Sequence, residues 1–94
     1  MFVVYILHSQ KLDKFYIGTT DDFDRRFKEH NSEEKPDAFS LRGRTWTKFL
    51  VIENLGSEQA YKMEDHIKRM KSKTYIMNLK KYPEMIEKLK LRYF

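Results

Sequence analysis

The sequence predicts an α+β fold in which a small three-stranded, mostly antiparallel sheet is flanked by helices. Two apolar runs near the start of the chain are separated by a short polar stretch, which is typical of a β-hairpin. A third alternating run lies in the middle of the chain, and the remaining apolar residues recur with a helical period. The expected order is therefore strand, strand, helix, strand, helix, helix.

The first two strands are expected over residues 2–7 and 15–19, on either side of a polar turn. Alternation places Tyr5 on one face of the first strand, and Tyr16 with Gly18 on one face of the second. Whether these two faces coincide depends on the register of pairing, which alternation leaves open.

Helix signals begin directly after the second strand. Residues 20–22 are suited to an N-cap and a first turn, and Phe23 and Phe27 repeat at i,i+4. The helix is expected to end near Asn31. Residues 32–44 carry a proline, a glycine and mixed charges without periodicity, so we expect a loop that is long enough to suggest a functional role.

The second half of the chain contains one more strand and several helical segments. Alternation over residues 46–52 predicts the third strand. A helix is expected over residues 57–71, and its apolar stripe consists of Ala60, Met63, Ile67 and Met70. The tail is helical in pieces, with one short helix over residues 75–79 and another opened by Pro83.

Ninety-four residues predict a single domain over residues 1–94, in which residues 73–94 form a basic helical C-terminal extension. The absence of cysteine excludes disulfides, thiolate catalysis and sulfur-ligated zinc, and it fits a reducing, cytoplasmic setting. No run approaches the roughly 20 apolar residues of a membrane span, and the N-terminus lacks the pattern of a signal peptide. We therefore expect a soluble protein without a membrane partner.

The net charge of +5 is concentrated in the second half of the chain. Residues 1–50 hold nine basic and eight acidic side chains, whereas residues 51–94 hold ten and six. Such a surplus favours nucleic acid as a partner, although a lysine-rich face is also an ordinary solvated surface.

Two polar residues share the apolar side of the predicted first helix. Arg26 and His30 fall on the same helical face as Phe23 and Phe27. A charged group directed toward a sheet needs a partner or a cleft. One explanation is a snorkelling arginine beside a hydrogen-bonded histidine, and the other is a functional site.

Glu64 has a similar position, on or beside the apolar stripe of the second predicted helix. One interpretation is an exposed ion pair with Lys68, which would stabilise the helix by roughly a few tenths of a kcal/mol. The other is a carboxylate that faces the same cleft as Arg26 and His30, where it would be a hard oxygen ligand for Mg²⁺ or Mn²⁺. Tyrosine hydroxyls, a fixed cation, a histidine and one carboxylate suit phosphodiester chemistry better than acyl transfer.

Five features follow one another along the chain: Val3-Val4-Tyr5, Tyr16-Ile17-Gly18, Arg26, His30 and Glu64. This layout resembles the GIY-YIG nuclease superfamily over roughly residues 2–72. Val3 stands where the family has its first glycine, a position that in small stand-alone members is often not glycine. With no targeting segment attached, the chain looks like the minimal catalytic module of the small bacterial URI-like branch.

The resemblance implies a single-metal mechanism. Glu64 would hold one Mg²⁺ or Mn²⁺ ion that stabilises the leaving 3′ oxygen, while Arg26 would offset charge on the transition state. A tyrosine would activate the attacking water, with His30 as a proton acceptor for Tyr5. Whether Tyr5 or Tyr16 is the base stays open.

The same resemblance implies substrate contacts. Gly18 would let the backbone of the second strand approach the phosphate. Further phosphate contacts and a stacking surface would come from Arg42, Arg44, Trp46, Lys68 and, as a loosely spaced match to a family asparagine, Asn78.

The leading hypothesis is thus a Mg²⁺-dependent DNA endonuclease module, with a part in DNA repair or recombination and a protein partner that supplies targeting. A second is a nucleic-acid binding module that cleaves poorly or not at all. A third is a protein-interaction domain that uses its aromatic surface. The choice between DNA and RNA, the substrate structure and the oligomeric state are left open by the sequence.

Overall fold

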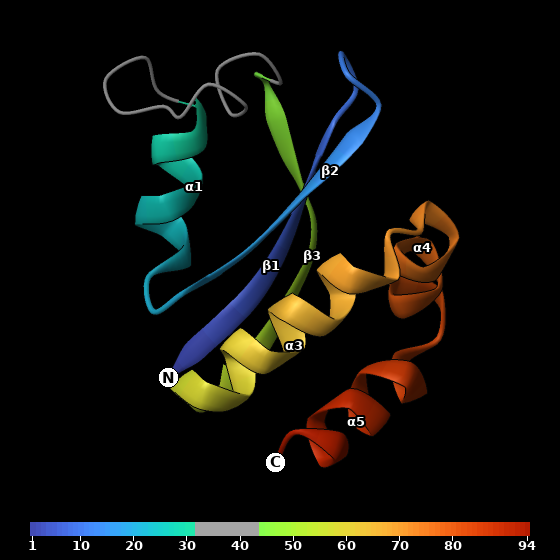
Figure 1. The fold of residues 1–94 in the computed structure, drawn as a ribbon. Coiled ribbons are helices and arrows are strands. Elements are labelled where there is room, and N and C mark those ends of the chain that lie inside the picture. Colours follow the sequence, from blue (N-terminus) through green and yellow to red (C-terminus); the bar gives the residue numbers. More distant parts are fainter. Residues whose placement is uncertain (32–43) are drawn as a thin grey trace.

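In the part of the chain that the structure describes, a three-stranded sheet lies between α1 (Phe23–Asn31) on one side and three helices on the other (Figure 1). The computed structural model describes residues 1–31 and 44–94. Within these residues the elements are β1 (Phe2–Ser9), β2 (Lys14–Thr20), α1 (Phe23–Asn31), β3 (Trp46–Leu55), α3 (Ser57–Met70), α4 (Lys73–Lys81) and α5 (Pro83–Arg92). The predicted α+β class is confirmed.

The sheet has the order β2-β1-β3, and both pairings are antiparallel. β1 is therefore the central strand, which accounts for its apolar, β-branched sequence. Its pairing with β3 has irregularities between Phe2 and Val4 and between Ile6 and Leu7. All three strands are longer than predicted, because polar residues at their ends still pair with neighbouring backbone.

The two faces of β1 belong to different hydrophobic clusters. Val4 and Ile6 pack in a cluster with the buried residues of α3, α4 and α5. Tyr5 and Leu7, which alternate with them, pack in a second cluster together with Trp46 and the aromatic face of α1. The alternation of β1 thus divides the protein into a helical side and an aromatic side.

The chain after β3 contains three helices, which correspond to the three predicted helical segments, although the predicted order counted the tail as one helix. The N–H of Tyr82 donates to the carbonyl oxygen of Asn78 at 2.7 Å, which closes α4, and Pro83 begins α5. Leu79 of α4 and Leu89 of α5 are buried in the same cluster as Val4, so these helices pack into the main core.

Side-chain caps begin two of the helices, at the predicted position for α1 and at an unpredicted one for α4. Oδ1 of Asp22 accepts a hydrogen bond of 3.2 Å from the N–H of Arg25 at the start of α1, and Oγ of Ser72 accepts one of 3.1 Å from the N–H of Tyr75 in α4. Met70, expected in the apolar stripe of α3, is 45% exposed, because the helix ends there. Within the described residues, no helix has the length and apolar character to cross a membrane.

Candidate active site

The register of the hairpin brings the two predicted tyrosines to one face of the sheet. Tyr5 pairs with Gly18, and Leu7 pairs with Tyr16. Residues paired directly across antiparallel strands point to the same side, so both phenol rings lie on the α1 side. Their centroids are 6.4 Å apart with 9° between the ring planes. The register answers the question that alternation left open.

Gly18 provides the space that the Tyr5 ring occupies. A Cβ atom at position 18 would lie 2.5 Å from Cζ of Tyr5, well inside van der Waals contact. Gly18 is itself buried, and its φ is not positive. The resemblance implied that this glycine lets the backbone approach substrate; in the structure, the place of its missing side chain is taken by Tyr5.

His30 connects α1 to the tyrosines. It is only 1% exposed, and its Nε2 lies 3.0 Å from the hydroxyl of Tyr5, which is equally buried. The imidazole also meets the ring of Tyr16, with 4.3 Å between centroids. The histidine is therefore hydrogen-bonded, as one of the two explanations held, but its partner is a tyrosine of the predicted site.

Burial raises the pKa of Tyr5 to about 12. The positive charge and hydrogen bonding of Arg26 act against this rise in pKa, whereas the charges of Tyr16 and Glu64 add to it. The Tyr5 hydroxyl is thus protonated at neutral pH. Of the two charged groups that influence this pKa, Arg26 has the larger effect and Glu64 the smaller.

Arg26 lies half-buried on α1 between the tyrosines and an acidic neighbour. One of its terminal nitrogens donates to Oε2 of Glu29 at 3.1 Å. Burial works against the charged form, but the charge of Tyr5, a hydrogen bond to it, and the charge of Tyr16 raise the pKa of Arg26 overall. The arginine supplies a permanent positive charge at the tyrosine hydroxyls.

Glu64 reaches the site from α3, which packs against both β1 and β2 on the other face of the sheet. Oγ1 of Thr19 lies 3.5 Å from the carbonyl oxygen of Ala60, and Glu64 follows one turn later. Its side chain is 17% exposed, and Oε2 accepts a hydrogen bond of 2.6 Å from Nζ of Lys68. The i,i+4 pair of the first interpretation is present, although Glu64 is mostly buried in it. The charge of Glu64 adds to the rise in the pKa of Tyr5, and its role as a metal ligand stays a prediction.

The donor set fits a hard metal ion that is held by few protein ligands. In the described parts of the chain, no group of three or more His, Asp or Glu side chains is arranged to hold a metal. Mg²⁺ is usually bound by one or two carboxylates, with water and substrate phosphate completing its shell. A single partly exposed carboxylate at Glu64 is compatible with that mode and not with a closed structural metal site.

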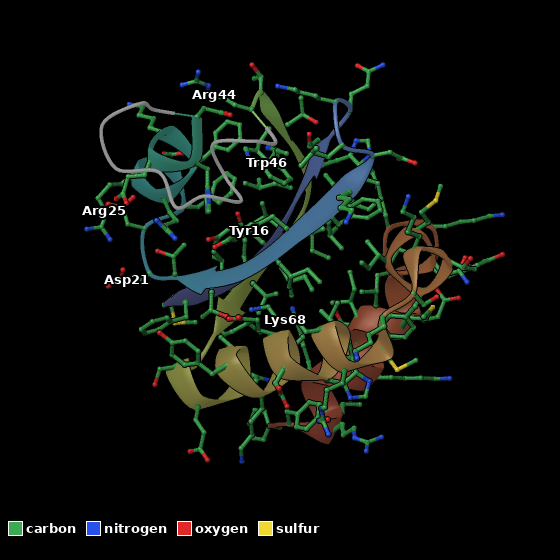
Figure 2. All side chains as sticks on the ribbon, turned by 45° about the horizontal axis from the view of Figure 1, so that its top comes forward. Tyr16, Asp21, Arg25, Arg44, Trp46 and Lys68 are labelled. Atoms are coloured by element: carbon green, nitrogen blue, oxygen red, sulfur yellow. The ribbon has the colours of Figure 1, made fainter. Side chains whose placement is uncertain are left out.

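Trp46 has a different role from the one predicted. It was expected to offer a stacking surface, but it is 1% exposed and lies beside Tyr16, with 5.8 Å between ring centroids (Figure 2). The prediction is wrong because the first residue of β3 faces the aromatic cluster rather than solvent. Trp46 supports Tyr16 from within the core.

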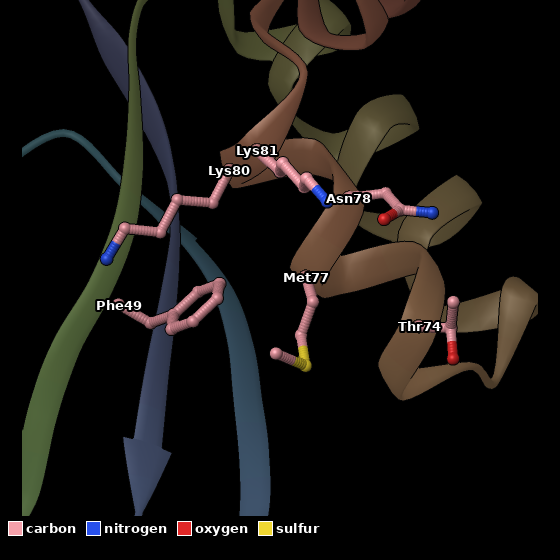
Figure 3. Close-up of a pocket in the computed structure, with 6 residues that line it drawn as sticks. All are labelled: Phe49, Thr74, Met77, Asn78, Lys80 and Lys81. Atoms are coloured by element: carbon pink, nitrogen blue, oxygen red, sulfur yellow. The ribbon is translucent and has the colours of Figure 1, made fainter.

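Asn78 is not brought to this site. It lines a pocket between α4 and β3 together with Phe49 and Met77 (Figure 3). Phe49 belongs to the cluster on the helical side of the sheet, opposite the tyrosines. The structure therefore places Asn78 on the face of the sheet opposite the tyrosines.

Two of the other predicted substrate contacts, Arg44 and Lys68, lie within the described residues. Arg44 is half-buried just before β3, and Lys68 lies on α3 (Figure 2). Lys68 is exposed, and its ammonium contacts Oε2 of Glu64. Arg42 lies outside the described residues.

Asn31 is a positioning residue that the sequence analysis treated only as a helix end. Its Nδ2 donates to the carbonyl oxygen of Trp46 at 3.0 Å, and its Oδ1 accepts from the N–H of Trp46 at 2.7 Å. This pair joins the end of α1 to the start of β3 and so seats the indole against Tyr16. An asparagine at a helix end often serves as a local cap, so its sequence position carries no signal of this distant contact.

Comparison with known proteins places this site in a family. Residues 1–81 match the GIY-YIG catalytic domain. No match was found among curated proteins or among solved structures. GIY-YIG proteins are nucleases that act on DNA and generally depend on a divalent metal. Because the match spans most of the described strands and helices, this chain belongs to the GIY-YIG nuclease family.

Proposed function

We propose that the protein is a metal-dependent DNA endonuclease that hydrolyses phosphodiester bonds with one Mg²⁺ or Mn²⁺ ion and a tyrosine base. The observation that supports this most directly is the buried hydrogen bond between Tyr5 and His30, with the charges of Arg26 and Glu64 acting on the same hydroxyl. Packing alone gives no reason to place a histidine and an arginine at the hydroxyl of a buried tyrosine.

In this proposal Tyr5 is the base and His30 receives its proton. A phenol with a pKa of about 12 does not ionise by itself at neutral pH. It can take a proton from water while giving its own to Nε2 of His30, which lies 3.0 Å away. The water becomes hydroxide, the Tyr5 hydroxyl is restored, and the imidazole becomes imidazolium.

Arg26 and Tyr16 complete the protein's own part of the reaction. The guanidinium of Arg26 stays charged and offsets negative charge that develops on the phosphate. Tyr16 is held between the imidazole of His30 and Trp46, so it can position the attacking water beside Tyr5.

Glu64 would hold the metal ion. When bound, the ion would polarise the phosphate and stabilise the leaving oxygen. The carboxylate must first be released from Lys68, whose ammonium contacts Oε2. Such a partly exposed pair is weak, so its exchange for a divalent ion costs little.

The test is cleavage of supercoiled, branched and single-stranded DNA in Mg²⁺, Mn²⁺ and EDTA, with Glu64→Gln in parallel. We expect metal-dependent cleavage that this substitution abolishes. Asp65→Asn is the matched control, because Asp65 is an exposed acid on the same helix that pairs with Arg69. Cleavage that survives Glu64→Gln would refute the assigned metal ligand.

A second function is a nucleic-acid binding module with little or no turnover. Two observations favour it. Lys68 occupies the carboxylate of Glu64, the residue assigned to the metal, and residues 51–94 carry a surplus of basic side chains. It predicts DNA binding that survives Glu64→Gln, with no cleavage in any metal. For either function we propose a cytoplasmic setting and a protein partner that supplies targeting.

A further inference from the structure

A lysine-rich groove lies next to Glu64, outside the cluster of tyrosines. It runs between β2 and the junction of α3 and α4 and has a volume of about 380 Å³. Four lysines line it: Lys14 from β2, Lys68 and Lys71 from α3 and its end, and Lys73 from α4. β2 and two consecutive helices from the second half of the chain thus place charge of one sign around one groove.

The floor of this groove is apolar. Phe15 and Ile17 of β2 line one side, and Ile67 and Ile76 line the other. Ile67 and Ile76 are almost fully buried. Lysine stems lie readily along such a surface while the ammonium groups stay in water. A low-dielectric wall beneath charges of one sign strengthens their field, so the groove attracts an anion more strongly than a flat lysine surface would.

The acidic groups that face the groove compensate only part of this charge. Lys73 donates to Oδ2 of Asp13 at 2.9 Å, and Lys68 is paired with Glu64. Lys14 and Lys71 have no ion-pair partner among the described residues. Two free ammonium groups therefore stand on opposite sides of the groove, on β2 and at the end of α3.

We propose that this groove binds the phosphate backbone of the DNA strand on one side of the cleaved bond. The inference rests on the proposed function for the identity of the polyanion, and it names the path of the strand. Lys68 connects the groove to the site, because it lines the groove and contacts Glu64. A strand whose phosphate lies at Glu64 continues along α3 toward Lys71 and Lys14.

The test measures binding in EDTA, where cleavage does not occur. A short labelled DNA duplex is titrated with the double variant Lys14→Gln, Lys71→Gln over a series of NaCl concentrations, with fluorescence anisotropy as the readout. The matched control is Lys81→Gln, Lys88→Gln, which removes the same charge from α4 and α5 at lysines that do not line the groove. Thermal melts followed by circular dichroism establish that both variants fold.

We expect the groove variant to reduce the slope of log K against log salt by about 1.8, or about 0.9 for each lost phosphate contact. Its affinity at 0.1 M salt should fall by about 10- to 100-fold, with a much smaller change in the control. The single variant Lys14→Gln should show half the change in slope. It provides the same test if the double variant does not fold.

Equal slopes for the groove variant and the control would overturn the proposal, as would a wild-type protein that does not bind the duplex at low salt. A polyglutamate peptide that binds through these lysines when DNA does not would assign the groove to an acidic protein and also overturn it. Cleavage in Mg²⁺ separates the two claims. If the wild type cleaves DNA but the groove variant and the control have equal slopes, the nuclease proposal stands and the groove proposal is refuted. If the slope changes but no cleavage occurs, the groove proposal stands and the nuclease proposal is refuted.

Discussion

The hydroxyl of Tyr5 lies 3.0 Å from Nε2 of His30, across the buried space between the central strand and α1. This contact links residues 25 positions apart, and it gives a proton on Tyr5 a path into the protein rather than back to solvent. In the proposed mechanism, Tyr5 passes its proton to His30, so the neutral hydroxyl of Tyr5 can be regenerated before the product leaves.

Tyr5→Phe should reduce kcat by about 100- to 10,000-fold, whereas Tyr16→Phe should reduce it less, because Tyr5 has the hydrogen bond to the proton acceptor. Single-turnover cleavage measures the chemical step. The double variant Tyr5→Phe, His30→Gln should reduce kcat little more than Tyr5→Phe alone does, because Tyr5 and His30 act as one unit in the proposed mechanism. A larger loss for Tyr16→Phe than for Tyr5→Phe would assign the base to Tyr16.

Gly18→Ala should destabilise the protein by about 1–3 kcal/mol and impair cleavage, because the new Cβ would overlap the ring of Tyr5. Urea unfolding measures the stability. Gly56→Ala is the control: a Cβ there meets nothing within 4 Å, so it should change the free energy of unfolding by less than about 1 kcal/mol. Equal stability for both variants would show that Tyr5 moves freely.

Asn31→Ala should lower the free energy of unfolding by about 1–3 kcal/mol, because the N–H and the carbonyl of Trp46 each lose a hydrogen-bond partner. Asn31→Asp retains an acceptor for the N–H but directs a carboxylate oxygen at the carbonyl of Trp46, so it should not restore stability. The fluorescence of Trp46, the protein's single tryptophan, reports the loss of packing during unfolding. Wild-type stability in Asn31→Asp would contradict this account of the contact.

Spectrophotometric titration should find one tyrosine that ionises near pH 12, and Tyr5→Phe should remove that step. The folded protein holds this proton more tightly than the unfolded chain, whose tyrosines have a pKa near 10. The resulting stability is therefore complete below pH 10 and is lost as the pH rises toward 12. If the stability of Tyr5→Phe falls between about pH 10 and 12 as much as that of the wild type, the assignment of this step to Tyr5 is contradicted.

Acid should weaken the packing of α5 on α3. Burial lowers the pKa of His66, and the charges of Arg92 and Arg69 lower that pKa further. His66 therefore binds a proton more readily in the unfolded chain than in the folded protein. Its contribution to the free energy of unfolding is complete above pH 6.5 and is lost as the pH falls below that value. Nδ1 of His66 lies 2.7 Å from the hydroxyl of Tyr93, beyond α5. His66→Gln should show a flatter dependence of the urea midpoint on pH, and an unchanged dependence would refute this.

The elements of this fold were predictable from the sequence because each is encoded by local periodicity. The alternation of β1 and the i,i+4 pair of Phe23 and Phe27 report burial directly, and the caps at Asp22 and Pro83 act within one turn. The order of Tyr5, Tyr16, Arg26, His30 and Glu64 along the chain likewise sufficed to indicate the family.

The tertiary structure alone decided how these residues meet. Pairing of Tyr5 with Gly18 sets both tyrosines on the α1 side, and a register shifted by one residue would have placed one of them opposite. Trp46 is buried because Asn31 ties its backbone to α1, and Asn78 is separated from the tyrosines because α4 packs on the other face of the sheet. Contacts of this kind join segments that no local pattern relates, so the sequence determined which groups the protein has, and packing across the sheet decided which of them act together.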